Sequence, residues 1–270
     1  MWAMVTTVPT PQTEAESTIV YPSSDGKPVA ETFVHLYAML VTIEVLTQYL
    51  QGQQATVLGN QFMYYAQGFP KLRVAPDVMI IFSVEPGGHD NYKIWEEGKV
   101  PSVIFEMTSQ GTRSKDEVFK KTLYAQLGVQ EYWLFDPKNE WLDPALQGYR
   151  LRVGPEESYY EPINNGICEP LQLELVHEEQ LIGFYRQDNG ERLLIPSELA
   201  VALKQEALAK QQAERQIEEE RQRAEEERQR AEEERQRAET AEQVQLETQK
   251  KLERLQAKLQ ELGVDPDDIG

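Results

Sequence analysis

The chain of 270 residues lacks most of the features that mark secreted, membrane and zinc-binding proteins. Its single cysteine, Cys168, cannot form an intramolecular disulfide and suits a reducing compartment. The three histidines stand in unrelated contexts without a Cys/His pair at zinc spacing, so we exclude a zinc site. No uncharged apolar stretch approaches the roughly 20 residues that span a bilayer, and the N-terminus has no basic segment followed by an apolar run. We therefore expect a cytoplasmic protein with no membrane segment.

Basic residues are also scarce relative to acidic ones. Lys and Arg total 27 against 46 Asp and Glu, which gives a formal net charge of −19. Such a charge favours solubility and opposes non-specific adhesion to nucleic acids or anionic membranes. Two common catalytic motifs are missing as well. Ser109 lacks a Gly-x-Ser-x-Gly elbow, and no Gly-rich phosphate loop ends in Lys-Ser/Thr, which argues against a serine hydrolase and a P-loop enzyme.

Composition divides the chain into four segments. Residues 1–24 are rich in Thr, Pro and Ser and are expected to form a flexible leader. Residues 25–196 contain nearly all the aromatic residues and can form a folded domain, whereas residues 197–262 are a charged tail of helical pattern. Residues 263–270 are expected to be a disordered end.

The order of elements within the folded segment predicts an α/β fold. Apolar residues at helical spacing predict a helix over 31–51, and short alternating runs predict strands. The other expected elements are strands at 55–66, 73–82, 101–107 and 131–136, a helix at 114–127, and short strands at 149–153, 171–176, 181–185 and 192–195. This order is typical of a mixed sheet flanked by helices, followed by antiparallel additions.

The tail carries a repeat of seven residues. The sequence Arg-Gln-Arg-Ala-Glu-Glu-Glu at 221–227 recurs at 228–234 and nearly so at 235–241. Its Glu–Arg pairs at i,i+4 support an isolated helix by about 0.2–0.5 kcal/mol each. The apolar seam is strongest near the end, at Leu252, Leu255, Leu259 and Leu262, while Glu occupies the central d positions. We expect a solvated single helix with a short Leu zipper at 252–262; a plain spacer is the simpler alternative. A homodimer would form through this zipper or through the core sheet.

Two carboxylates are embedded in apolar, strand-like segments. Asp77 lies within residues 73–82, and Glu106 lies within residues 102–108. Burying a carboxylate is costly unless it is paired or binds a metal. Because Mg²⁺ is bound by a few carboxylate oxygens and keeps waters for substrate phosphates, the pair is a candidate divalent-metal site. The alternative is that Asp77 begins a turn after Pro76 and that Glu106 pairs with a core Lys or Arg.

The helix expected at 114–127 adds a lysine to this pair. Its inward side is defined by Phe119, Leu123 and Leu127. Lys120 lies about 60° from this direction, whereas Lys121 lies about 160° away and points to water. Lys120 can therefore reach the carboxylates, where it would orient or help deprotonate an attacking water or steady charge on a phosphate. The alternative is a snorkelling lysine paired with Asp116.

Two more polar residues of this helix are candidates for supporting roles. Asp116 lies about 20° from the inward direction and would hold Lys120 or Ser109. A carboxylate at a helix N-terminus is equally well explained by the helix dipole. Tyr124 follows Lys120 by one turn and would either hydrogen-bond to the same site or pack in the core.

Several sequence stretches together resemble a known family. They are Pro76-Asp77, Glu106-Met107-Thr108-Ser109, the series Asp116, Lys120 and Tyr124, and Gly128-Val129-Gln130-Glu131-Tyr132-Trp133-Leu134-Phe135-Asp136-Pro137. Over roughly residues 25–195 the chain resembles the Uma-type putative restriction endonuclease family, a branch of the PD-(D/E)xK nuclease superfamily. The segment 190–196 and the charged helical tail also look like members of this family.

The resemblance implies a restriction-endonuclease-like core that hydrolyses phosphodiester bonds in DNA with Mg²⁺, or with Mn²⁺ in its place. It assigns Asp77 and Glu106 as metal ligands, with the backbone carbonyl of Met107 as a third. The chain departs from the superfamily pattern at Thr108, where a lysine is usual, and Lys120 matches the lysine that the family carries on the following helix. A non-catalytic scaffold that retains the fold and associates through its tail is the alternative.

The acidic balance of the chain bears on the DNA substrate. Duplex binding usually needs several Lys or Arg contacts to phosphates. The basic residues concentrated near the proposed site are Arg113, Lys115, Lys120 and Lys121, with Lys71, Arg73, Arg150 and Arg152 as further candidates. Such a local basic rim predicts weak and salt-sensitive DNA binding.

Overall fold

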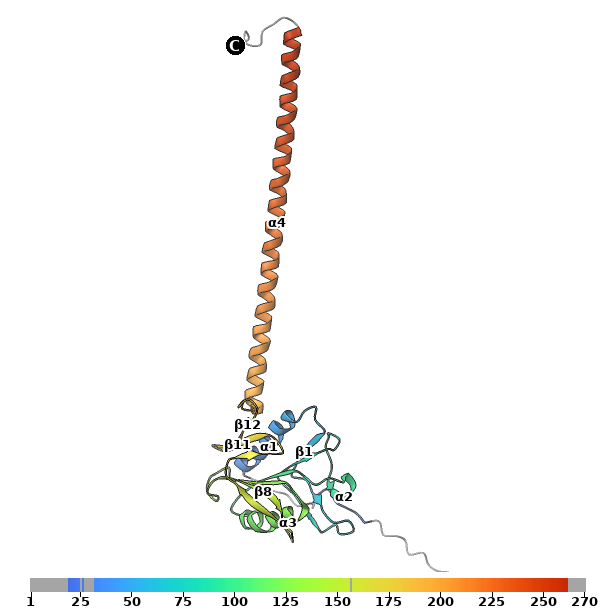
Figure 1. Cartoon of the computed structure of the whole chain (residues 1–270), viewed down its shortest axis with the longest axis vertical. Helices are drawn as coiled ribbons and strands as arrows, with labels where there is room; N and C mark the ends of the chain where they lie inside the picture. The colour runs from blue at the N-terminus through green and yellow to red at the C-terminus, as the bar shows by residue number, and fades with distance from the viewer. Residues whose placement is uncertain (1–18, 25, 27–31, 156, 262–270) are drawn as a thin grey trace, which may run out of the picture. The chain divides into compact units, whose positions relative to one another are not determined.

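The structure of the chain is a computed structural model, shown in Figure 1. It describes residues 19–24, 26, 32–155 and 157–261. The chain divides into two units, of which the first ends at Leu199 and the second begins at Ala200. Residues 1–18 of the expected leader and the expected disordered end at 263–270 lie outside the described residues.

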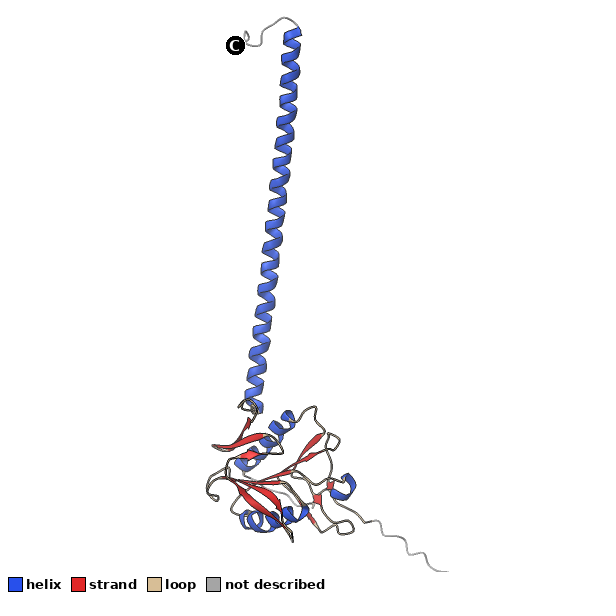
Figure 2. Ribbon diagram, viewed as in Figure 1, coloured by secondary structure: helices blue, strands red, loops and turns tan. Residues whose placement is uncertain are grey.

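A six-stranded mixed sheet is the centre of the first unit (Figure 2). In spatial order its strands are β1 (Ala55–Gly59), β4 (Val78–Phe82), β6 (Val103–Met107), β7 (Glu131–Phe135), β8 (Leu146–Val153) and β9 (Ser158–Ile163). β6 and β7 are parallel, and the other neighbours are antiparallel. The carboxyl ends of β6 and β7 therefore meet at one edge, where the Thr108 N–H donates to the Phe135 carbonyl at 2.7 Å. The expected α/β class is confirmed.

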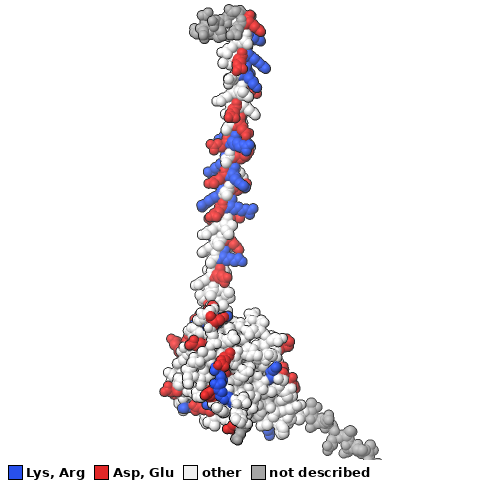
Figure 3. All heavy atoms as spheres, viewed as in Figure 1, with Lys and Arg blue, Asp and Glu red and all other residues white. Residues whose placement is uncertain are grey.

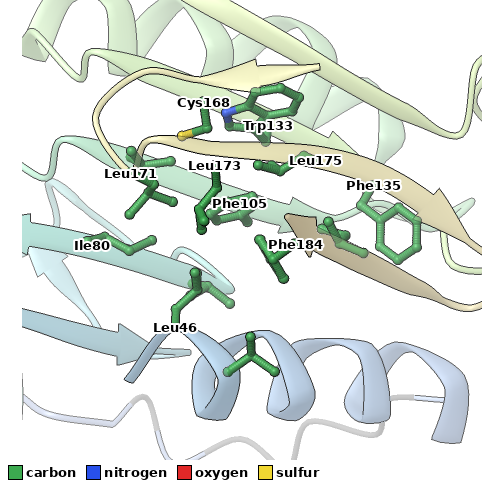
Figure 4. Packing of buried hydrophobic residues seen from close by; sticks show 14 of the residues in the cluster. Leu46, Ile80, Phe105, Trp133, Phe135, Cys168, Leu171, Leu173, Leu175 and Phe184 are labelled. Atoms are coloured by element: carbon green, nitrogen blue, oxygen red, sulfur yellow. The ribbon is translucent and has the colours of Figure 1, made fainter. Parts of the chain in front are cut away.

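One face of this sheet packs against helix α1 (Phe33–Tyr49) and a small antiparallel sheet. The small sheet consists of β10 (Ile167–Cys168), β11 (Leu173–Glu178) and β12 (Leu181–Arg186). Side chains alternate along a strand, so Phe105 of β6 faces this layer. Figure 4 shows it among Leu46 of α1, Trp133 of β7 and Phe184 of β12, all of which are buried. This cluster forms the larger part of the core.

The opposite face packs against a helical segment and a second small sheet. That sheet contains β2 (Met63–Tyr64), β3 (Arg73–Val74) and β5 (Tyr92–Lys93), and the short helix α2 (Ile94–Glu97) follows β5. Ile104 of β6 and Tyr132 of β7 face this side and pack with Tyr124. Glu106 has the same alternation as Ile104, so it points toward the same layer.

Part of the expected leader contacts the domain. The ring of Tyr21 packs 5.1 Å from that of Tyr64 and 5.2 Å from that of Trp95. Its hydroxyl accepts a hydrogen bond from the Gly68 N–H at 2.6 Å, and its carbonyl accepts one from Asn91 at 3.3 Å. Residues around Tyr21 thus belong to the packed surface of the first unit.

The helix expected at 114–127 is two helices of different pitch. A π-helical turn, η1 (Lys115–Lys120), runs into the α-helix α3 (Lys121–Leu127). The prediction that Phe119 faces inward is wrong, because this side chain is 49 % exposed. A π-helix bonds i to i+5 and so advances less per residue than the α-helical period assumed from the sequence. Lys121 does not simply point to water either, since its Nζ lies 3.4 Å from the centroid of the Tyr149 ring.

Other strand predictions also needed correction. The expected strands at 55–66 and 73–82 each split into two strands of different sheets, β1 with β2 and β3 with β4. Asn60, at φ 49°, turns the chain after β1. Residues 192–195 form no strand; Arg192 makes only an isolated bridge with Tyr185. The sequence reasoning missed α2, β5, β9 and β10.

The long helix α4 (Pro196–Glu261) contains most of the second unit. Acidic and basic side chains are intermixed along it (Figure 3), and Arg235 pairs with Glu239 at 3.0 Å in the i,i+4 geometry. Leu252 and Leu255 are exposed on its surface, whereas Leu262 of the expected zipper lies outside the described residues. No helix in the described part of the chain is both long and apolar enough to cross a membrane.

Candidate active site

Glu106 is almost completely buried. Its side chain is 1 % exposed, on the face of β6 that packs against α3. Its Oε2 accepts a hydrogen bond from Lys120 Nζ at 2.7 Å, and its Oε1 accepts one from the Tyr124 hydroxyl at 2.8 Å. Burial raises the pKa of Glu106 to about 8; the Lys120 ammonium opposes this rise, and the carboxylates of Asp77 and Asp116 add to it. Any further positive charge nearby would therefore stabilise the ionised form of Glu106.

Lys120 joins two buried carboxylates. Its side chain is 8 % exposed, and its Nζ lies 3.0 Å from Asp116 Oδ1 in addition to the contact with Glu106. Burial by itself lowers the pKa of Lys120, but the carboxylates of Glu106, Asp116 and Asp77 outweigh this effect and raise it above its usual value. Lys120 is thus held as a cation. The turn η1 and helix α3 place Asp116, Lys120 and Tyr124 on one side at intervals of four residues.

Asp77 enters the site from the strand next to β6. It stands immediately before β4, and its Oδ2 accepts a hydrogen bond from the Met107 N–H at 2.7 Å. Its own N–H lies 3.4 Å from Glu106 Oε2. The antiparallel pairing of β4 with β6 produces this arrangement by setting Val78 opposite Phe105. Asp77 and Glu106 are therefore neighbours, as the sequence predicted.

His35 is a site neighbour that the sequence reasoning missed. It lies buried in the first turn of α1, with Nε2 3.6 Å from Asp77 Oδ2. That distance is too long for a hydrogen bond but short enough for an electrostatic contact. Thr32 caps the helix by accepting from the His35 N–H at 3.4 Å. A histidine among the buried positions of α1 was the available signal, and it did not reveal the contact with Asp77.

The residues directly after Glu106 take other roles. Ser109 does not join Lys120 or Asp116 in the described contacts; its Oγ lies 3.3 Å from Thr112 Oγ1, within the turn that leads into η1. Thr108 is buried at the end of β6. The backbone N–H of Met107 is used by Asp77, while its carbonyl as a metal ligand stays a prediction.

The assembled groups carry more negative than positive charge. Three carboxylates, those of Asp77, Glu106 and Asp116, surround the single ammonium of Lys120. Oxygen ligands of this kind suit a hard divalent cation, and one such ion would offset the remaining charge. Within the described residues, no group of three or more His, Cys, Asp or Glu side chains is arranged to hold a metal by itself. A cation here would therefore depend on two carboxylates and on oxygens from water or substrate.

Comparison with known proteins identifies the family of the chain. Among curated proteins, no sequence matches the chain. Among solved structures, the chain is similar to a crystal structure titled as a putative nuclease belonging to DUF820 from Anabaena variabilis ATCC 29413. The identity is 16 %, the match covers 53 % of this chain and 74 % of that chain, and the TM-score is 0.35. The model of the Uma2 family, described as putative restriction endonuclease, matches residues 14–165, more than half of the chain. The chain belongs to the Uma2 family of putative restriction endonucleases.

Proposed function

We propose that the protein is a Mg²⁺-dependent endonuclease that hydrolyses phosphodiester bonds in DNA, with Mn²⁺ able to replace Mg²⁺. One observation carries this proposal. Asp77 and Glu106, on adjacent strands, meet a buried ammonium, that of Lys120, at one edge of the sheet. Two carboxylates beside a fixed cation supply both the oxygen ligands and the positive charge that phosphoryl transfer uses. Family membership supports the same general activity.

The metal would be held by Asp77 and Glu106, with the Met107 carbonyl as a third ligand. When bound, a divalent cation would supply Lewis-acid activation of the phosphate. The remaining chemistry belongs to residues of the chain. The carboxylate of Asp77 is oriented by the Met107 N–H, and the carboxylate of Glu106 is oriented by the hydroxyl of Tyr124.

Lys120 would act as a fixed cation. Because neighbouring carboxylates raise its pKa above the usual value, its amine keeps the proton at neutral pH. A protonated amine can donate a hydrogen bond to an attacking water or stabilise negative charge that develops on the phosphate, but it cannot accept a proton. Asp116 would position this ammonium through the 3.0 Å contact. We therefore favour the orienting and charge-stabilising roles over deprotonation of water.

The test is divalent-dependent nicking of supercoiled plasmid and cleavage of single-stranded DNA by the full chain. We expect activity with Mg²⁺ or Mn²⁺ and its loss in EDTA, in Asp77→Asn, in Glu106→Gln and in Lys120→Met. Lys121→Met is the matched control, because it removes the adjacent ammonium, which lies over the Tyr149 ring instead of the carboxylates. Calorimetric titration with Mg²⁺ separates binding from turnover. Cleavage undiminished in Lys120→Met, or metal binding that survives both carboxylate changes, would contradict the assignment.

A second proposal concerns α4, which would mediate homodimerisation through 252–262. Leu252 and Leu255 are exposed at the spacing of a coiled-coil seam. Sedimentation velocity of the full chain should show a dimer that Leu252→Glu with Leu255→Glu dissociates, while Gln256→Glu leaves it intact. A dimer that survives the double change would assign the contact to the core sheet, and a monomeric wild type would leave α4 as a spacer.

The buried Cys168 fits a reducing, cytoplasmic setting for the protein.

A further inference from the structure

A small cavity lies at the carboxyl ends of the two parallel strands. Its volume is about 270 Å³. Its wall includes Thr32 and His35 at the start of α1, Thr108 and Ser109 after β6, and Lys138 and Trp141 after β7; we call it the edge pocket. Ligands of α/β sheets commonly bind outside the carboxyl ends of parallel strands. The location therefore suits a binding function.

The edge pocket adjoins the candidate active site through two of its lining residues. His35 lies 3.6 Å from Asp77, measured from Nε2 to Oδ2. Thr108 follows Glu106 by two residues, directly after the end of β6. A group that occupies the pocket would thus be a neighbour of any phosphate bound at Asp77 and Glu106.

Thr108 contributes a hydroxyl that the described structure leaves unused. The side chain is 2 % exposed, and its Oγ1 has no hydrogen-bond partner among the described residues. A buried hydroxyl without a partner is unfavourable, and such groups call for an explanation in terms of function or an additional bound group. Thr108 lines the edge pocket, but its Oγ1 is closed off from the pocket in this structure, so a polar ligand held there would become its partner once the side chain rotates.

The opposite wall is held rigid by one buried carboxylate. Asp136 accepts backbone N–H bonds from Lys138 at 3.0 Å, from Glu140 at 2.7 Å and from Leu142 at 3.1 Å. It also accepts the N–H of Trp141. The backbone of the turn that carries Trp141 is therefore fixed in advance, which lowers the entropy lost when a ligand binds. An aromatic side chain on such a turn is suited to stack on a nucleobase.

Size and charge indicate one unpaired nucleotide as the occupant of the edge pocket. The volume of about 270 Å³ is at the lower limit of small-molecule sites, about 300–1,000 Å³. A base that stays stacked in a duplex cannot enter such a cavity. Duplex binding also relies on many phosphate contacts by Lys and Arg, which the net charge of −19 opposes, whereas stacking on an aromatic side chain supplies part of the affinity for a single strand.

We propose that the edge pocket binds the nucleoside next to the cleaved phosphate, so that the substrate class is single-stranded DNA rather than intact duplex. This inference rests on the proposed function, since it gives the pocket its role beside the metal site. Trp141 stacks on the base, and the Thr108 hydroxyl hydrogen-bonds to the nucleoside. Lys138 supplies positive charge toward the backbone of the strand.

Binding can be measured apart from cleavage. Fluorescence anisotropy of a labelled dT12 oligonucleotide, in Ca²⁺ and again in EDTA, gives the affinity of the full chain, and a labelled 12-base-pair duplex is the comparison. Trp141→Ala should weaken dT12 binding by about 5- to 140-fold, which corresponds to 1–3 kcal/mol for one stacked base. Trp141→Phe should retain most of the affinity. Trp95→Ala is the matched control, because Trp95 lies at Tyr21 and does not line the edge pocket.

Thr108→Val keeps the shape of the side chain and removes only the hydroxyl. It should weaken dT12 binding by about 2- to 10-fold, the range for one hydrogen bond. Its urea unfolding midpoint should be unchanged or raised, because no partner in the described structure loses a bond. A merely structural role for Thr108 predicts the reverse, a lowered midpoint with unchanged binding.

The outcomes separate this inference from the proposed function. Duplex bound as tightly as dT12, or unchanged binding by a folded Trp141→Ala protein, overturns the inference even if the wild type cleaves DNA. Weakened binding by Trp141→Ala and Thr108→Val supports the pocket even if no cleavage is found. In that case the hydrolytic proposal fails and the binding site stands.

Discussion

Replacing Lys120 with methionine should strongly destabilise the first unit. Methionine keeps most of the aliphatic length but removes the ammonium that lies 2.7 Å from Glu106 Oε2 and 3.0 Å from Asp116 Oδ1. Both carboxylates are almost completely buried and would lose their cation. Removing one partner of a buried ion pair costs about 3–5 kcal/mol, because the remaining charge is left uncompensated. Since whole domains are stable by only about 5–15 kcal/mol, the expected loss is a large part of the total.

Urea unfolding followed by tryptophan fluorescence measures this loss. All four tryptophans precede residue 142, so the signal reports the unit that contains Glu106 and not α4. Lys121→Met is the matched control and should cost about 1 kcal/mol, the value of one cation–π contact. Equal unfolding midpoints for the two single lysine variants would refute the reasoning.

Three further predictions follow from packing, charge and metal binding. Gly148→Ala should cost about 1–3 kcal/mol in thermal unfolding, because a Cβ there would lie 2.5 Å from the Trp133 ring. Gly183→Ala should cost less, because its Cβ would meet the partly exposed Glu178 side chain instead of a buried ring. Glu131→Ala should lower the free energy of unfolding by about 2–3 kcal/mol, since Glu131 is buried and accepts from Arg150 at 2.9 Å; an unchanged urea midpoint would contradict this. Mg²⁺ at about 100 times its dissociation constant should stabilise the wild type by about 2.7 kcal/mol, seen as a raised melting temperature that EDTA reverses, and no shift at any Mg²⁺ concentration would argue against the site.

The strand portion of the site could be predicted from the sequence because it depends on short-range rules. Alternation along β6 places Glu106 on the face opposite Phe105, and pairing with the preceding strand places Asp77 beside it. The contact of His35 with Asp77 could not be predicted, because it depends on where α1 crosses the sheet. The place of Trp141 in the wall of the edge pocket likewise depends on the turn that donates its backbone N–H groups to the Asp136 carboxylate.

The helical and peripheral parts were harder to predict. A wheel of 3.6 residues per turn selected Lys120 but placed Phe119 in the core, since the π-helical turn leaves no signal in hydrophobic periodicity. Strand β9 was missed because Tyr159, Glu161 and Pro162 interrupt the alternation typical of a half-buried strand. Such a sequence is compatible with an edge strand, which is the position β9 occupies.

The π-helical turn also bears on how freely this protein can change during evolution. Its inner arc, Asp116 and Lys120, is buried, and Lys120 contacts both Asp116 and Glu106, whereas its outer arc, Val118 and Phe119, is exposed. Substitutions on the outer arc alter no buried contact and are expected to be nearly neutral for stability, within about 0.5 kcal/mol. Loss of a single residue between Asp116 and Lys120 would instead break the four-residue spacing that places both side chains on the inner side. The segment should therefore tolerate sequence drift while resisting changes in length.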